Sequence, residues 1–204
     1  MSLYFKKETG SVLNPVFLKI IERSLGGALI KVDSRLPNSL HTIFEGTPVA
    51  ICSTAGEYIW MKSAVLSTLK ATNTTRIVIY PPNPFKIGDY IGVSGANELA
   101  AATCATITAV APTYIVTAQT TYSLAKHEVV YQANAANATA PRFRPYALLE
   151  NPLVVRDEDG TTKYNVFGSL VHRGSVAQSV FRWGYPADVK NRLSRMRFVK
   201  QGQV

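Results

Sequence analysis

Ile77-Val-Ile-Tyr-Pro-Pro-Asn-Pro-Phe-Lys-Ile-Gly-Asp-Tyr-Ile-Gly-Val93 is the most strongly patterned stretch of the chain. A run of β-branched residues leads into a proline-rich corner, and an alternation of apolar and polar residues follows it. This order is typical of two strands of a small barrel or sandwich that are joined by a rigid loop. The stretch therefore predicts β structure at the centre of the chain.

The second of these strands begins after the motif Phe85-Lys-Ile-Gly-Asp89. Glycine tolerates the backbone angles of a tight turn, so Gly88 suits the start of the strand. An aspartate side chain accepts hydrogen bonds from nearby backbone amides, and we expect Asp89 to cap this turn. We also expect Phe85 and Ile87 to face one side and to anchor the loop.

Further short strand patterns flank this stretch and are separated by turn residues. They occur at 49–53, 58–66, 104–110, 114–117 and 128–132. Strands at this spacing indicate a compact barrel or sandwich. We therefore predict a β-barrel or β-sandwich unit that spans residues 46–133.

An N-terminal arm with one helix is predicted over residues 1–45. Asn14 suits the N-cap, Pro15 suits the first helical position, and Gly26-Gly27 suits the end of the helix. The helix is expected near residues 14–25, and two partners remain open for its apolar face: the chain's own domain or a neighbouring subunit. That apolar face contains Val16, Phe17, Ile20, Ile21 and Leu25.

The last third of the chain predicts a separate β segment. Residues 134–145 are expected to form a linker or surface loop, because their composition is low in complexity. Residues 146–204 predict strands, a short helix that begins at Pro186, and a closing strand at 196–199. Together, the patterns predict a mainly β protein: a small β-barrel or β-sandwich unit with an N-terminal arm containing one helix and a C-terminal strand-helix-strand segment.

The charge of the chain favours an acidic partner. The sequence contains 22 Lys and Arg against 13 Asp and Glu, a net charge of +9, and its isoelectric point is about 9.6. Nucleic acid, an anionic membrane and an acidic protein surface all fit such an excess. The excess lies toward the C-terminus, since residues 141–204 contain eleven basic and five acidic residues.

Basic and aromatic residues alternate in the C-terminal tail, which begins at Arg182-Trp-Gly-Tyr185. One interpretation is nucleic-acid binding, with bases stacked on the rings and phosphates on the basic side chains. The other interpretation is contact with an acidic protein surface, or a solvated basic face. The second is favoured because the tail also contains apolar residues that tie it into a core, namely Leu193, Met196 and Phe198.

No catalytic, metal-binding or cofactor-binding residues are predicted. His41, His127 and His172 are scattered without metal-binding spacing, and Ser175 lacks the glycine-flanked turn of a hydrolase nucleophile. Asp157-Glu-Asp-Gly160 predicts a hairpin turn and not a calcium loop, because the further acidic ligand of such a loop is missing. We therefore expect that the chain is not an enzyme and requires no cofactor.

Cys52 and Cys104 are the only cysteines. Their apolar surroundings predict free, buried thiols, with one disulfide as the alternative. No signal peptide is recognisable, and no run approaches the ~20 apolar residues that a membrane helix needs. We expect a soluble protein that is synthesised inside a cell and does not contact a membrane.

Four motifs in order carry a resemblance to a known group of proteins. They are Thr9-Gly-Ser-Val-Leu-Asn-Pro-Val-Phe17, Ser24-Leu-Gly-Gly-Ala-Leu-Ile-Lys-Val-Asp33, Phe85-Lys-Ile-Gly-Asp-Tyr-Ile91 and the series Gly168, Pro186, Val189, Leu193 and Met196-Arg-Phe-Val199. Across most of its length the chain resembles the head decoration or head-fibre (auxiliary capsid) proteins of tailed bacteriophages, notably those of crAss-like gut phages.

The resemblance implies a structural protein of the virion, made in the host cytoplasm and bound to the major capsid protein on the outer capsid surface. It also implies self-association, often as a homotrimer, and contact with a fibre or another virion protein. The chain has no long repetitive shaft, so decoration of the head or anchoring of a fibre fits better than a fibre itself. The alternative function is a nucleic-acid-binding β-barrel that uses the basic C-terminal segment, and nucleic acid is the less favoured partner.

Capsid or subunit contacts are predicted for the apolar residues of the arm and for the basic and aromatic residues of the tail. These residues are Leu3, Tyr4, Phe5, Val16, Phe17, Ile20, Ile21, Arg182, Trp183, Tyr185, Arg192 and Arg195.

Overall fold

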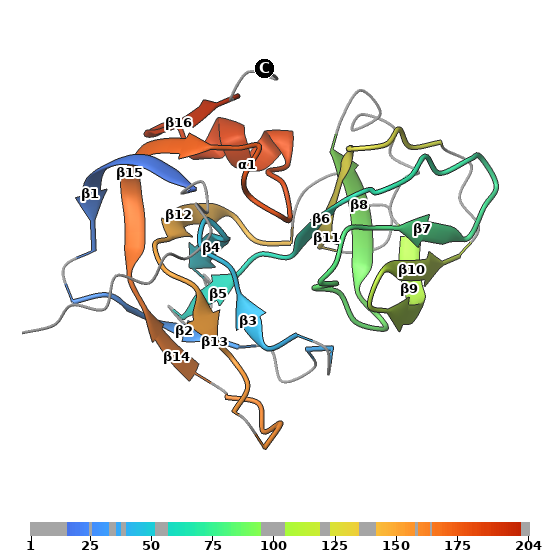
Figure 1. The fold of residues 1–204 in the computed structure, drawn as a ribbon, viewed down its shortest axis with the longest axis horizontal. Coiled ribbons are helices and arrows are strands. Elements are labelled where there is room, and N and C mark those ends of the chain that lie inside the picture. Colours follow the sequence, from blue (N-terminus) through green and yellow to red (C-terminus); the bar gives the residue numbers. More distant parts are fainter. Residues whose placement is uncertain are drawn as a thin grey trace, which may run out of the picture.

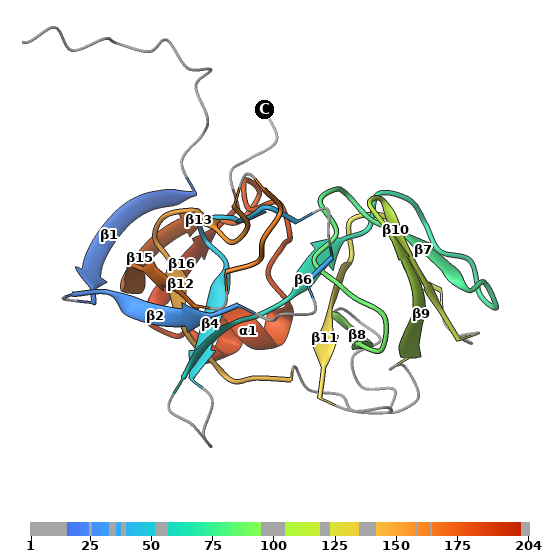
Figure 2. The same cartoon turned by 90° about the horizontal axis from the view of Figure 1, so that it is seen from below.

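The computed structural model describes residues 16–24, 26–32, 36–37, 40–51, 57–94, 105–118, 123–134, 142–157, 159–163 and 165–200. This part of the chain forms sixteen β-strands and one short helix, arranged as two curled sheets and one two-stranded sheet (Figures 1 and 2). The prediction of a mainly β protein with a barrel-like unit is confirmed.

The larger sheet combines strands from both ends of the chain and curls into a half-barrel. Its strands are β1 (Phe17–Arg23), β2 (Ala28–Lys31), β4 (Pro48–Ile51), β5 (Tyr58–Trp60), β12 (Pro145–Leu149), β14 (Asn165–Gly168), β15 (Leu170–Ala177) and β16 (Met196–Val199). Their order is β1-β15-β12-β4-β5-β2-β14, and β16 pairs with β15 off this path. Only Ser169 separates β14 from β15, which lie near opposite ends of this order. Because a single residue links two strands from nearly opposite ends of the order, the sheet curls until these ends lie close together.

The smaller, six-stranded sheet lies beside the half-barrel (Figure 1). Its strands are β6 (Ser63–Val65), β7 (Arg76–Val78), β8 (Tyr90–Ser94), β9 (Ala105–Ala111), β10 (Tyr114–Thr117) and β11 (Val129–Ala133), in the order β6-β11-β8-β9-β10-β7. Its two end strands meet, since Leu66 bridges to Ile79 and the Tyr80 amide donates to the Val65 carbonyl at 3.0 Å. The third sheet contains only β3 (Thr42–Ile43) and β13 (Leu153–Val154).

The predicted unit over residues 46–133 begins too early. Strands β4 and β5 pair with each other and join the half-barrel through β12 and β2, so the six-stranded sheet starts only at β6. Val49, Ala50 and Trp60 gain full burial in the larger core from this pairing. The local pattern predicted these strands but contained no information about a partner nearly 100 residues away. Residues 135–141 of the predicted linker lie outside the described part.

Strand β1 replaces the helix that was predicted near residues 14–25. β1 pairs antiparallel with β15, with irregularities in register after Phe17 and after Ile20. Because a β-bulge adds a residue to one strand, the half-buried side chains of β1, Phe17 and Ile20, lie three positions apart. Such spacing resembles the period of a helix. The predicted cap residues Asn14 and Pro15, and also Leu25, lie outside the described residues.

The C-terminal strand-helix-strand prediction is confirmed. Helix α1 (Ala187–Arg192) follows Pro186, and β16 closes the described chain. This six-residue helix is far too short to cross a membrane. Strand β16 pairs parallel with β15 and ends with Val199 opposite Ala177, whereas β1 begins with Phe17 opposite Val176. The predicted hairpin turn after Asp157 is also present, and Arg156 bridges to Thr162 across it.

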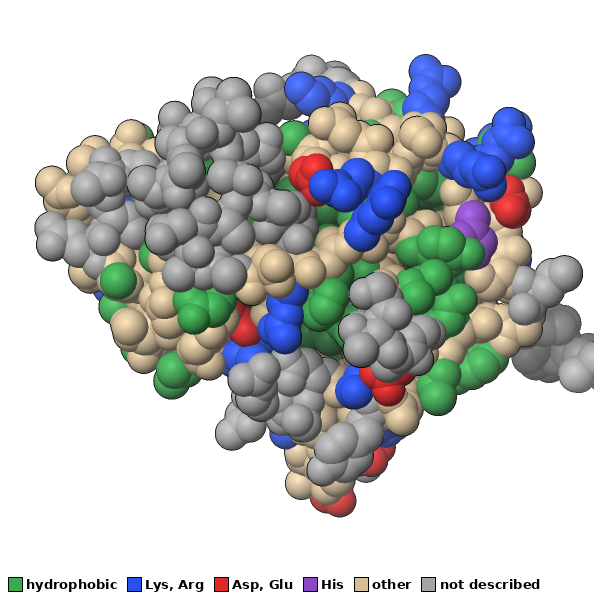
Figure 3. Space-filling view, turned by 180° about the vertical axis from the view of Figure 1, so that it is seen from behind, with side chains coloured by type: hydrophobic (Ala, Val, Ile, Leu, Met, Phe, Trp, Pro, Cys, Tyr) green, Lys and Arg blue, Asp and Glu red, His purple; other side chains and the backbone are tan. Residues whose placement is uncertain are grey.

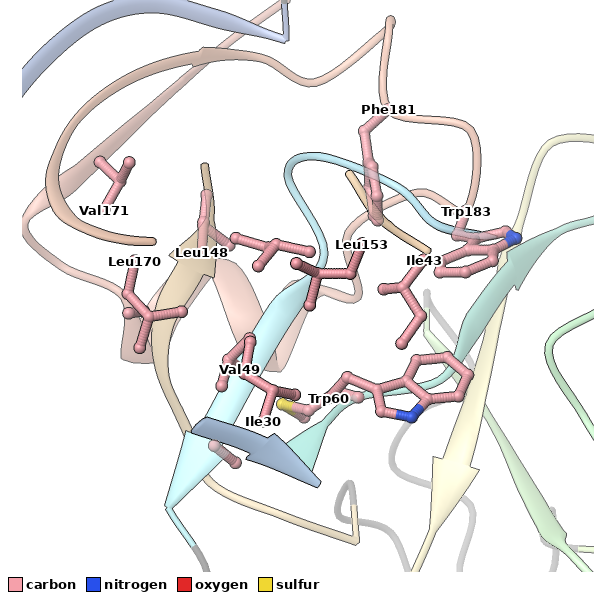
Figure 4. Packing of buried hydrophobic residues seen from close by; sticks show 14 of the residues in the cluster. Ile30, Ile43, Val49, Trp60, Leu148, Leu153, Leu170, Val171, Phe181 and Trp183 are labelled. Carbon is pink, nitrogen blue, oxygen red and sulfur yellow. The ribbon is translucent and has the colours of Figure 1, made fainter. Parts of the chain in front are cut away.

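The core of the half-barrel contains two tryptophans (Figure 4). The Trp183 ring lies 5.7 Å from the Trp60 ring and 5.1 Å from the Phe44 ring, measured between centroids. The segment around Trp183 also contacts the connection between β7 and β8: the Trp183 indole N–H donates to the Pro82 carbonyl at 2.9 Å. Beside it, the Ser63 hydroxyl donates to the Gly184 carbonyl at 3.0 Å. Residues 183 and 184 therefore join the two β units.

The proline corner forms much as its sequence predicts. Gly88 has a φ of +86°, and the Lys86 amide donates to Asp89 Oδ2 at 3.1 Å, so the predicted turn and cap are both present. Phe85 is fully buried. Ile87 is 64% exposed, which corrects the prediction that it anchors the loop together with Phe85.

A buried ion pair lies next to this corner. Lys62 Nζ is 2.9 Å from Asp89 Oδ2, and each side chain is only 2% exposed. Gln132 Nε2 donates to the other carboxylate oxygen at 2.7 Å. The network connects the chain just before β6 with the residue that precedes β8 and with the end of β11, so it ties together three parts of the six-stranded sheet.

Candidate functional site

A large open groove of about 730 Å³ lies on the half-barrel. We call it the arginine groove. Figure 3 shows basic side chains gathered along the upper right of one face, next to a histidine and above a hydrophobic area. The groove is lined by Glu22, Arg23, Ser24, Ile51, Arg144, Pro145, Tyr146, His172, Arg192, Leu193, Ser194 and Arg195.

The groove forms where β15 changes its neighbour. Val171 of β15 pairs with Leu148 of β12, but Gly174 pairs with Met196 of β16. The two neighbouring strands therefore diverge beside His172. A register shift in β12 also places Tyr146 outside the regular pairing with β4, and its side chain is 46% exposed. Bulges commonly reorient a side chain in this way.

Four arginines line the groove, and they differ in their partners. Arg23 pairs with Glu150 at 3.2 Å, and Arg192 Nε lies 2.8 and 2.9 Å from the two carboxylate oxygens of Asp188. Arg144 and Arg195 are exposed, and no carboxylate of the described residues pairs with either of them. These two guanidinium groups can each offer a planar set of donors to an oxyanion.

His172 is one of the residues that line the groove. Its Nε2 is 2.6 Å from the Ser24 hydroxyl, and its ring contacts the Tyr146 ring edge-to-face at 4.9 Å. Burial lowers the pKa of His172 below the usual 6.5, Glu22 opposes that shift, and Arg195 adds to it. The imidazole therefore favours its neutral form.

The contact between Ser24 and His172 has the distance of a nucleophile and its base. A hydrolytic triad also needs a group that orients the other ring nitrogen. No carboxylate in the described part makes a hydrogen bond to His172, so the pair is incomplete as a triad. Within the described residues, no three His, Cys, Asp or Glu side chains gather closely enough to hold a metal ion.

A second, more open hollow of about 530 Å³ lies near the junction of the two β units. His127 stacks on Tyr80 beside it, with 6.1 Å between the ring centroids. Its lining combines apolar side chains with one arginine, Arg182, whose guanidinium lies over the Phe44 ring at 5.0 Å. Since Arg182 already has a partner of its own, this hollow offers less for recognition than the arginine groove.

The predicted contact residues fall into separate places. Arg192 and Arg195 line the groove, and Ile21 is exposed on β1. Val16 is buried, and Phe17 and Ile20 pack against the core of the half-barrel. Leu3, Tyr4, Phe5, Cys52 and Cys104 lie outside the described residues.

The structure corrects the prediction that Trp183 and Tyr185 of the tail are contact residues. Trp183 is fully buried and Tyr185 is 5% exposed, so both belong to the core and neither ring offers a stacking surface. The Tyr185 hydroxyl donates to the Gly46 carbonyl at 3.0 Å, and burial raises the pKa of Tyr185 well above its usual value. The nucleic-acid interpretation therefore loses the aromatic rings on which bases were expected to stack.

Sequence reasoning did not identify Arg23, Arg144 or the contact between Ser24 and His172. These residues come from three distant segments that only the strand pairing brings together. The single signal in the sequence was the basic excess after residue 141, which includes Arg144. Comparison with known proteins gave no match to any family model, curated protein or solved structure.

Proposed function

We propose that this chain is a structural virion protein that binds the outer surface of a tailed-phage capsid. There it decorates or stabilises the head, or anchors a head fibre. The observation that carries the proposal is the arginine groove, in which Arg144 and Arg195 have no described acidic partner. A surface of this kind suits recognition of an acidic protein.

Two further features support the proposal. The motif order described above resembles that of head decoration proteins over most of the chain. The described part also exposes apolar side chains on the strands at the two ends of the half-barrel sheet: Leu18 and Ile21 on β1, and Phe167 on β14. Exposed apolar side chains on edge strands suit contacts with other subunits. The proposed partners are the major capsid protein and further copies of the chain.

Mass spectrometry of purified particles of the phage that encodes the chain tests this proposal. We expect the chain to co-purify with DNA-filled heads through a density gradient. We also expect its lysines to be labelled when intact particles are treated with a reagent that cannot enter the shell. A protein enclosed within the head serves as the control for shell integrity. Absence of the chain from particles, or labelling only after disruption, would contradict the proposal.

A further inference from the structure

We propose that the arginine groove binds an extended acidic segment of a partner protein, with the carboxylates of two acidic side chains paired to Arg144 and Arg195. This inference rests on the proposed function, because the capsid shell would supply the segment. It adds the chemical class of the ligand and the residues that recognise it.

The first support is the division of the four arginines. Glu150 and Asp188 hold Arg23 and Arg192 in place. Arg144 and Arg195 come from different parts of the chain: Arg144 directly precedes β12, and Arg195 lies in the loop before β16. Arginine forms paired hydrogen bonds to a carboxylate, which give direction as well as attraction. Two arginines without described acidic partners therefore match two acidic side chains of one segment.

The second support is the apolar part of the lining. Ile51 is 38% exposed and Tyr146 is 46% exposed, and both line the same groove as the arginines. The Tyr146 ring is held between Tyr58, at 6.1 Å, and His172, at 4.9 Å. A contact surface fixed before binding loses less entropy on association. A segment with alternating acidic and apolar residues would satisfy both kinds of lining.

The same contacts favour a peptide over nucleic acid. Single-stranded nucleic acid is bound by stacking its bases on free aromatic rings along a continuously basic track. Tyr146 already contacts two rings of the protein, and Trp183 and Tyr185 are buried. The exposed carboxylate of Glu22 also lines the groove and would repel a phosphate backbone. A peptide can place an apolar or polar residue opposite Glu22.

Fluorescence anisotropy with the full-length protein tests the inference. The probe is a fluorescein-labelled pentapeptide, Glu-Leu-Glu-Leu-Glu, and the comparison ligand is a labelled oligothymidylate of the same net charge. We expect saturable binding of the peptide that weakens with salt, and weaker binding of the oligonucleotide at equal ionic strength. Tighter binding of the oligonucleotide would overturn the assignment and favour nucleic acid.

Variants locate the binding site. Arg144→Ala and Arg195→Ala should each weaken peptide binding about tenfold, as expected for loss of one charged hydrogen-bonding pair. The matched control is Arg197→Ala, which removes an exposed arginine of β16 that does not line the groove, and it should bind as the wild type does. Circular dichroism checks that each variant is folded. Wild-type affinity in the double variant Arg144→Ala/Arg195→Ala would overturn the inference.

Incorporation into particles separates this inference from the proposed function. A double variant that enters particles at the wild-type level would overturn the groove as the docking site, while the virion role would stand. Conversely, peptide binding that depends on both arginines would support the groove even if the chain were absent from particles. In that case the acidic partner would lie outside the virion.

Discussion

At the scale of single residues, Asp89 holds three separate elements through one carboxylate. It accepts hydrogen bonds from Lys62, Gln132 and the Lys86 amide. Replacement by asparagine would remove the negative charge that faces the buried Lys62 ammonium. Loss of one partner of a buried ion pair costs about 3–5 kcal/mol. We therefore predict that Asp89→Asn lowers the free energy of unfolding by about that amount in urea titrations followed by tryptophan fluorescence.

Asp188→Asn is the matched control for Asp89→Asn. It removes the carboxylate that pairs with Arg192 on the surface of α1, where both side chains are partly exposed. Solvent-accessible ion pairs contribute about 0–1 kcal/mol. Equal effects of the two substitutions would contradict the importance assigned to the buried pair.

The lowered pKa of His172 predicts a dependence of stability on pH. Burial favours the neutral imidazole in the folded chain, so the unfolded chain takes up the proton first as the pH falls. The contribution of His172 to stability is therefore complete above its usual pKa of 6.5 and is lost below it, toward the lower pKa of the folded state. We expect His172→Gln to flatten the fall in urea midpoint between about pH 7.5 and pH 5. An unchanged slope would argue against this role.

At the scale of elements, the attachment of β1 depends on a close approach to β15. A Cβ atom added to Gly174 would collide with the backbone carbonyl of Lys19, which cannot move without shifting β1. Overpacking of this kind costs about 1–3 kcal/mol. We predict that Gly174→Ala destabilises the β1–β15 pairing and speeds amide hydrogen exchange in β1 more than in the six-stranded sheet.

Ser175→Ala is the control for Gly174→Ala. Ser175 also lies opposite β1, paired with Lys19, but already carries a Cβ atom, so its replacement adds no atom at the interface. We expect hydrogen exchange in β1 close to that of the wild type. Similar acceleration in both variants would show that the close approach at Gly174 is unimportant.

Strand β1 also shows where pattern reasoning fails at this scale. Asn14, Pro15 and the paired glycines at 26 and 27 predicted the two ends of a helix, and the spacing of Phe17 and Ile20 suited its apolar face. The irregularity in register between Phe17 and Lys19 gave a strand the same spacing. A short helix gains little stability without tertiary packing, whereas β1 gains the backbone hydrogen bonds of β15. Local residues alone do not distinguish these outcomes.

At the scale of the whole molecule, Gly184 lies at the junction of the two β units. Its φ is +69°, and an added Cβ atom would lie 2.7 Å from Val65 and 2.8 Å from Val129. Gly160 has a similar φ of +87° but open space around it. Left-handed backbone costs a residue other than glycine about 1–2 kcal/mol. We predict that Gly160→Ala lowers stability by that amount only.

Gly184→Ala should cost about 1–3 kcal/mol more than Gly160→Ala, because Val65 and Val129 must also move. Trp183 is adjacent, so the change should also alter the tryptophan emission of the folded protein, as it would not in Gly160→Ala. Equal losses of stability in the two variants, measured by urea titration, would contradict a tight junction at Gly184.

Most of the strands could be predicted from the sequence, but little of their arrangement could. The proline corner, with Gly88 and Asp89, could be predicted because every residue that shapes it is local. The assignment of β4 and β5 to the half-barrel could not, since β12 lies far along the chain. The same holds for the groove: the basic excess could be seen in the sequence, but the presence of Arg144 and Arg195 in one groove depends on the point where β12 and β16 diverge.

The arrangement of β1 and β16 on β15 has a mechanical consequence. Phe17 lies opposite Val176 and Val199 lies opposite Ala177, so the first and last described strands flank the same end of β15. A load that draws these two ends apart would peel each strand from β15, breaking hydrogen bonds one after another. A load that pulls both ends in the same direction along the axis of β15 would shear many hydrogen bonds at once. The half-barrel therefore resists force best when both ends are tethered to one surface and the load acts from the opposite side.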